Sequence, residues 1–118
     1  MDATNLSQAT RQFADARRTL VNAIVDACRN HGDEIQFPDD PRYRILFNNG
    51  KGRCTAKPKR LYKCGDEILL NVEFFNSSAS TDVGWHIPVV NLTNDELYDL
   101  GIRTTDLLIK EQDAGTTN

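Results

Sequence analysis

A chain of 118 residues that is 39% hydrophobic and 26% charged suits a single soluble globular domain, large enough to bury its own core. Its apolar runs are only a few residues long, far below the ~20 residues of a membrane-spanning helix, so we expect no membrane contact. No basic region followed by an apolar run opens the chain, which predicts no secretory signal. The cysteines, Cys28, Cys54 and Cys64, are too sparse for a disulfide scaffold, and we expect reduced thiols in a cytoplasmic protein.

The net charge of −3 conceals an uneven distribution of charge along the chain. Residues 42–63 hold eight lysines or arginines and no acid, whereas residues 64–118 hold ten acids against Arg103 and Lys110. Blocks of opposite charge either attract each other within one fold or face separate partners. The acidic C-terminal part is therefore one candidate for neutralising the basic segment.

Residues 5–31 are predicted to form one long helix, because apolar residues recur at steps of three and four. The stripe comprises Leu6, Ala9, Phe13, Ala16, Leu20, Ala23, Ile24 and Ala27, extended by Cys28 and His31. Gly32 suits the left-handed position after the helix ends. At ~1.5 Å per residue this helix is about 40 Å long, longer than a sheet it could cover. We expect most of it to pack on its own sheet and its first turns to overhang, where the alanines permit close approach of a second helix.

Residues 67–75 form the expected central strand of an antiparallel sheet, since apolar side chains alternate there with Glu67, Asn71 and Glu73. A short edge strand is expected near Ile35 and Phe37, another strand at residues 43–47, and a further one at residues 83–89. Pro88 restricts that last strand to an edge or to its own end, because proline donates no backbone hydrogen bond.

Two turns fix the pairing of the strands. Asn49-Gly50 predicts a type I′ hairpin with Ile45 opposite Cys54, and Gly65-Asp66 predicts a type II′ hairpin with Leu61 opposite Leu70. The two hairpins share the strand between the turns. On this strand the residues expected to face the core have even numbers in the first hairpin and odd numbers in the second. A β-bulge or break is therefore predicted at residues 57–59, around Pro58.

Residues 93–96 form a capping box, Thr93-Asn-Asp-Glu96, which predicts a short helix that ends at Leu100 and is closed by Gly101. A second short helix is expected from Thr104 or Thr105. The predicted fold is one α+β domain over residues 1–112: a long N-terminal amphipathic helix on a four- or five-stranded antiparallel meander, with two short C-terminal helices. Residues 113–118 are expected to be a frayed polar tail.

The basic segment is the leading functional candidate. On the predicted strands, basic groups and one aromatic ring point away from the core or sit at turns. The candidate contact residues are Arg44, Arg53, Lys57, Lys59, Arg60 and Tyr62. We expect a small non-enzymatic protein-interaction module, an accessory subunit or an inhibitor, that binds an acidic protein or pairs with itself as a homodimer. The alternative is nucleic acid, with phosphates held by the cations and a base stacked on the tyrosine.

Metal and enzyme chemistry are weaker candidates. Cys28 and His31 are spaced i, i+3 on a helix, and with Cys54 and Cys64 they make a conceivable Cys3His zinc set, although no Cys-x2-Cys pair is present. His86 would need a nucleophile such as Cys64 or a serine of residues 77–80, and a carboxylate such as Asp82. The sequence contains no phosphate-binding or hydrolase motif. We therefore predict no cofactor and no catalytic residues.

Overall fold

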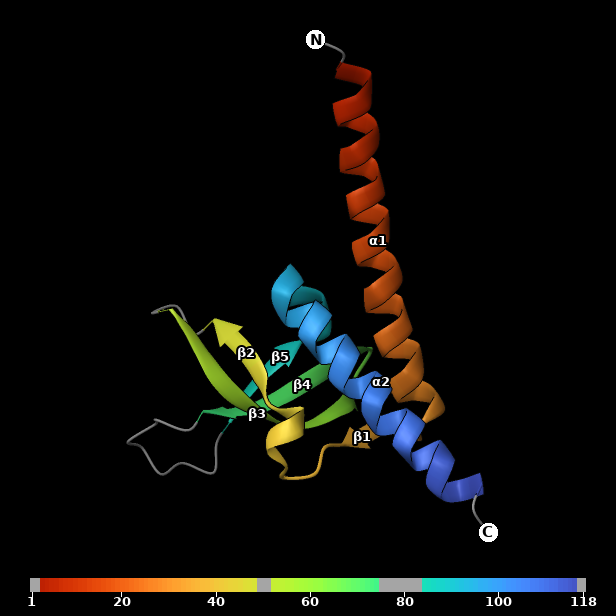
Figure 1. The fold of residues 1–118 in the computed structure, drawn as a ribbon, viewed down its shortest axis with the longest axis vertical. Helices are drawn as coiled ribbons and strands as arrows, with labels where there is room; N and C mark the ends of the chain where they lie inside the picture. Colours follow the sequence, from red (N-terminus) through yellow and green to blue (C-terminus); the bar gives the residue numbers. More distant parts are fainter. Residues whose placement is uncertain (1–2, 49–51, 75–83, 117–118) are drawn as a thin grey trace.

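The computed structural model describes residues 3–48, 52–74 and 84–116, in which a five-stranded antiparallel sheet and two α-helices enclose one core (Figure 1). The elements are α1 (Ala3–Asn30), β1 (Glu34–Gln36), the 3-10 turn η1 (Pro41–Tyr43), β2 (Ile45–Asn48), β3 (Arg53–Cys64), β4 (Glu67–Phe74), β5 (Trp85–Pro88), the 3-10 turn η2 (Val89–Asn91) and α2 (Asn94–Thr116). The expected α+β class is confirmed. Within these residues, neither helix is long and apolar enough to span a bilayer.

Helix α1 is longer than the domain that it packs against. Only Val21, Ile24 and Cys28 of its residues are buried, and all side chains of residues 3–16 are exposed. Figure 1 shows this N-terminal half extending away from the sheet and from α2. The helix ends as predicted, with Gly32 in the left-handed region at φ 76°. The predicted overhang is present, and it is longer than the first turns alone.

The sheet has the strand order β1-β3-β4-β5, and β2 pairs with β3 beside β1. Strand β4 lies between β3 and β5, as expected for the central strand. Strand β5 forms one edge and ends at Pro88, which agrees with the restriction that proline imposes. The expected start of this strand at Val83 lies outside the described residues.

The pairing of β3 confirms the predicted bulge. Its second half pairs Leu61 with Leu70 as predicted, and the register shifts between Pro58 and Arg60. The first hairpin differs, because Ile45 lies opposite Ala56 and not Cys54. This change of two positions along β3 keeps every side chain on its expected face. The predicted turn at residues 49–50 lies outside the described residues.

The predicted pair of short C-terminal helices is wrong, because α2 continues without a break through Gly101 to Thr116. A Cβ on Gly101 would lie 3.2 Å from Leu20 Cδ1, so the glycine allows α2 to cross α1 closely and does not end the helix. Thr104 and Thr105 each donate the hydroxyl to a carbonyl four residues earlier, at 2.7 and 2.8 Å. Both hydroxyls are thus satisfied inside the helix, and neither starts a new one.

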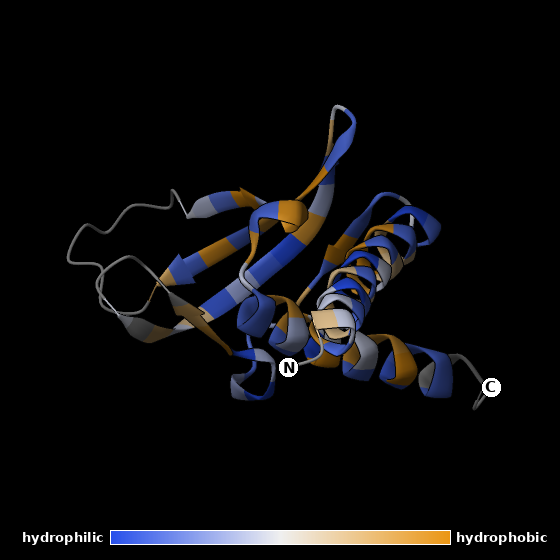
Figure 2. Cartoon of the chain, turned by 90° about the horizontal axis from the view of Figure 1, so that it is seen from above, coloured by the Kyte–Doolittle hydropathy of each residue, from blue (hydrophilic) through white to orange (hydrophobic). Residues whose placement is uncertain are grey.

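The start of α2 is the predicted capping box. Thr93 Oγ1 accepts a hydrogen bond from the Glu96 amide at 3.2 Å, and Glu96 Oε1 accepts one from the Thr93 amide at 2.8 Å. Leucines on the inner face of α2 join the sheet and α1 in a single core, and polar and apolar residues alternate along the strands (Figure 2). The large residues that are almost wholly buried include Ile35, Ile45, Leu61, Leu70, Val72, Val89, Leu92, Leu97 and Leu100.

Candidate functional site

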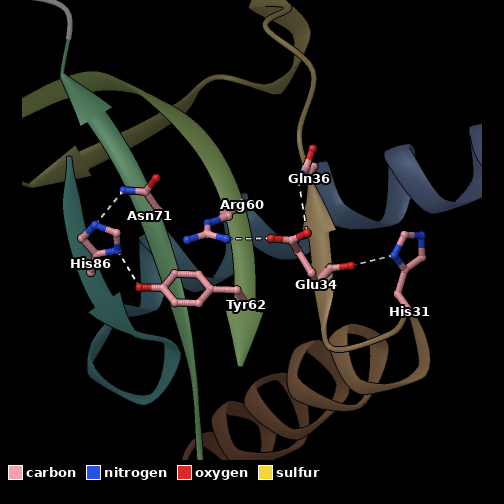
Figure 3. A network of polar contacts seen from close by, with 7 residues as sticks. All are labelled: His31, Glu34, Gln36, Arg60, Tyr62, Asn71 and His86. Atoms are coloured by element: carbon pink, nitrogen blue, oxygen red, sulfur yellow. Dashed lines mark hydrogen bonds and ion pairs between the residues drawn. The ribbon is translucent and has the colours of Figure 1, made fainter. Parts of the chain in front are cut away.

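The face of the sheet opposite the core carries a row of polar side chains. Because neighbours along a strand point to opposite faces, burial of Ile35, Leu61 and Leu70 turns the residues beside them outward. We call this group the outer-face network. Its members are Glu34, Gln36, Arg60, Tyr62, Asn71 and His86. They come from β1, β3, β4 and β5 and lie side by side across the sheet (Figure 3).

Arg60 is the centre of one half of this network. Its Nη1 lies 2.7 Å from Glu34 Oε2, and its guanidinium lies 4.1 Å from the centroid of the Tyr62 ring. Gln36 Nε2 also donates to Glu34 Oε1, at 3.2 Å. The hydrogen bonds from Arg60 and then Gln36 lower the pKa of Glu34, so this carboxylate stays charged at neutral pH.

His86 is the centre of the other half. The Tyr62 hydroxyl lies 2.6 Å from His86 Nδ1, and the two rings meet edge to face. Asn71 Nδ2 lies 3.5 Å from His86 Nε2 and donates to the Trp85 carbonyl at 3.2 Å. Among the described residues, His86 therefore contacts a phenol and an amide, which hold its ring in position. The candidate partners at residues 77–80 and 82 lie outside the described residues.

Three of the predicted basic contact residues form ion pairs within the domain. Lys57 Nζ lies 3.2 Å from Asp39 Oδ1 and Lys59 Nζ lies 3.3 Å from Glu73 Oε2, in addition to the pair between Arg60 and Glu34. Of these acids, Glu73 belongs to the acidic part of the sequence, residues 64–118, whereas Glu34 and Asp39 precede the basic segment. Of the other predicted residues, Arg44 is half-buried directly before β2, and Arg53 is the first residue of β3.

The candidate zinc ligands do not come together. Cys28 is fully buried, and burial raises the pKa of its thiol. His31 Nδ1 lies 2.8 Å from the Glu34 carbonyl and Nε2 lies 2.8 Å from Glu111 Oε2. Cys54 is half-buried in β3 and Cys64 is exposed at the end of that strand. Across the part of the chain that the structure describes, no group of three or more His, Cys, Asp or Glu side chains is placed to hold a metal ion.

The second candidate surface is the exposed N-terminal half of α1, residues 3–16, which we call the free half. Its largest apolar side chains, Leu6 and Phe13, are 69% and 58% exposed. Arg17 marks where it leaves the body of the domain: Nη2 donates to the carbonyls of Val90 and Leu92 at 2.9 and 2.7 Å. These bonds tie α1 to the segment before α2, so the free half projects in a defined direction.

A shallow groove of about 380 Å³ continues this surface onto α2. It is lined by Leu20, Tyr98, Gly101, Ile102, Thr105 and Asp106. The overhang of α1 was predicted from the sequence, whereas the exposure of Tyr98 and Ile102 was not. The available signal in the sequence was the spacing of four residues between Tyr98 and Ile102, which places them on one face of a helix. The predicted helix end at Gly101 lay between them and obscured this signal.

A second hollow, of about 390 Å³, lies between β2 and the start of α2. Asp99 Oδ2 accepts the Leu46 amide there at 3.0 Å, which satisfies a backbone donor on the outer edge of β2. A carboxylate that occupies an edge amide protects that edge against strand addition. The carboxylate in this hollow therefore has a structural role at the edge of β2.

Comparison with protein-family models, with curated proteins and with solved structures finds no match to this chain. The choice of function therefore depends on two surfaces, the outer-face network and the free half of α1. Within the described residues, Arg60 of the first surface is paired with an acid, as are Lys57 and Lys59 of the same strand, whereas Leu6 and Phe13 of the second surface are mostly exposed to solvent.

Proposed function

We propose that this chain is a small protein-interaction module, an accessory subunit or inhibitor without catalysis of its own, and that the free half of α1 makes the contact. One observation carries the proposal: Leu6 and Phe13 are 69% and 58% exposed on a helix that projects beyond its own domain. Most helical stability in proteins comes from packing of an apolar face, and among the residues that the structure describes nothing covers this one.

Site-specific photo-crosslinking in cells tests this proposal. A photoreactive amino acid replaces Phe13 on the apolar stripe, and the matched control replaces Arg11, which is also exposed but lies on the opposite side of α1. We expect protein adducts from position 13 and few from position 11. Equal yields from the two positions, or none from either, would contradict the proposed contact.

The predicted basic contact residues, Arg44, Arg53, Lys57, Lys59, Arg60 and Tyr62, form an alternative contact surface, either for an acidic protein or for nucleic acid. The stacking of Arg60 on the half-exposed Tyr62 ring favours it, because such a pair can hold an anion and stack a base. The ion pair between Arg60 and Glu34 argues against this surface, since a ligand must displace that carboxylate. The test is a quadruple variant, Arg44→Glu, Arg53→Glu, Lys59→Glu and Arg60→Glu. Unchanged partner affinity would rule this face out, and a nucleic-acid partner would show affinity that falls steeply with salt.

A further inference from the structure

The free half of α1 carries a short coiled-coil seam with alternating large and small residues. Leu6, Ala9, Phe13 and Ala16 are spaced by three, four and three residues, the a and d spacing of a heptad repeat. All four side chains are exposed. The residues of α1 that enter the domain core, Val21, Ile24 and Cys28, lie further along the helix, so this seam is separate from the contact with the sheet.

The pattern of this seam is complementary to itself in one orientation. When two copies are aligned antiparallel about position 11, Leu6 of each copy faces Ala16 of the other, and Ala9 faces Phe13. Every large side chain then meets an alanine, which is the arrangement that fills space without overpacking. A parallel alignment would place Phe13 against Phe13 and alanine against alanine, leaving crowded and empty layers in turn.

The residues beside the seam favour an identical partner over a charged one. Asn5, Thr10 and Gln12 flank it and are uncharged, and the fourth flanking residue, Arg17, donates to the carbonyls of Val90 and Leu92 in its own domain. Charged flanking positions normally select a partner of opposite sign, and like charges there would repel a second copy. Arg18 pairs with Asp15 at 3.1 Å on the outward side of the helix. Three neutral flanking residues, and an arginine that is already bonded within its own domain, therefore permit self-pairing.

We propose that the free half of α1 pairs antiparallel with the free half of a second copy, so that the protein is a homodimer. This inference rests on the proposed role of the free half as the contact surface and names its occupant. In this alignment Ala3 of one copy lies opposite Thr19 of the other, next to Leu20. The first turn of each α1 thus reaches the groove between α1 and α2 of its partner.

Sedimentation of the full-length protein over a concentration series tests the dimer. We expect a species of twice 13.3 kDa in the wild type. Phe13→Glu should weaken self-association at least tenfold, and the matched control Gln8→Glu, exposed but off the seam, should leave it unchanged. Circular dichroism of both variants confirms that they fold, which is expected because neither side chain is buried. A monomeric wild type at all concentrations would overturn the homodimer, and so would a dimer that survives Phe13→Glu.

Disulfide trapping tests the orientation. In a Cys64→Ser background, which removes the exposed native thiol, a Leu6→Cys chain is mixed with an Ala16→Cys chain and oxidised with glutathione disulfide. The antiparallel pair predicts a cross-linked heterodimer from this mixture and little from Leu6→Cys alone. The reverse result would show a parallel pair and overturn the proposed register. Adducts from position 13 in cells to a different protein, with a monomer in solution, would retain the proposed function and reject the homodimer.

Discussion

Gly101 of α2 lies directly against Leu20 of α1, where a Cβ on the glycine would come within 3.2 Å of Leu20 Cδ1. A glycine inside a helix costs roughly 1 kcal/mol relative to alanine. The close crossing offsets that cost, because it lets both helices cover the same face of the sheet. The contact lies one turn after the free half of α1 ends at Ala16.

Replacement of Gly101 by leucine should destabilise the domain by about 1–3 kcal/mol, since the new side chain would push α2 away from Leu20. Urea unfolding measures the change. Gly101→Ala is the control: the tip of the half-buried Leu20 side chain can rotate away and alanine favours the helix, so we expect a net change below about 1 kcal/mol. In a Leu20→Ala background the penalty of Gly101→Leu should shrink, and an undiminished penalty would place the crowding elsewhere.

Local rules predicted the parts of the fold in which a few adjacent residues decide the geometry. The bulge followed from two turns whose core positions on β3 disagree in parity, and it lies between Pro58 and Arg60 as predicted. The capping box of Thr93 and Glu96 is also present as predicted, because it too depends on a few adjacent residues. Gly101 was misread because a helix end and a close helix crossing both favour glycine. The deciding neighbour, Leu20, is far away in the sequence.

The ion pairs show the same limit of local sequence rules, because the fold brings their partners together. The sequence displayed a basic block and an acidic block, but the observed pairs depend on strand register and on a loop. Glu34 of β1 meets Arg60, and Glu73 of β4 meets Lys59, because both strands flank β3. The members of the outer-face network could have been inferred from alternation along each strand. Their contacts required the pairing of β1, β4 and β5 as well.

Removal of the cap of α2 should weaken the domain measurably. Thr93→Ala deletes the acceptor for the Glu96 amide and is expected to cost about 1 kcal/mol of unfolding free energy. Glu96→Ala should cost as much or more, because this side chain is only 4% exposed and its loss leaves the Thr93 amide without its acceptor. Glu96→Gln keeps an acceptor oxygen and serves as the control. Equal stability of the alanine and glutamine variants in thermal or urea unfolding would refute the cap.

The link between His31 and Glu111 should make stability depend on pH. Hydrogen bonds to the Glu34 carbonyl and then to Glu111 raise the pKa of His31 above its ordinary value of 6.5. The raised pKa means that this stabilisation is full below pH 6.5 and is lost as pH rises through the pKa of the folded state. Both side chains are well exposed, so the effect should stay below about 1 kcal/mol. His31→Gln should therefore cost more at about pH 5.5 than at about pH 8.5 in urea unfolding. An equal cost at the two pH values would contradict the assignment, and Glu111→Gln should show a weaker form of the same pH dependence.

The three cysteines should react with a maleimide in the order of their exposure. Cys64 is exposed and should be labelled first, Cys54 is half-buried and should follow, and Cys28 should be labelled only when the domain opens. Two causes protect Cys28: its exposure is 0%, and burial raises the pKa of a thiol that must ionise to react. Mass spectrometry after timed labelling, with fully denatured protein as the reference for three reactive thiols, gives the rates.

Because Cys28 lies at the end of α1 that is packed in the core, its labelling rate reports the opening of that packing. Equal rates for Cys28 and Cys64 in native buffer would show that α1 detaches readily. The free half would then be part of a mobile helix and not a rigid contact surface.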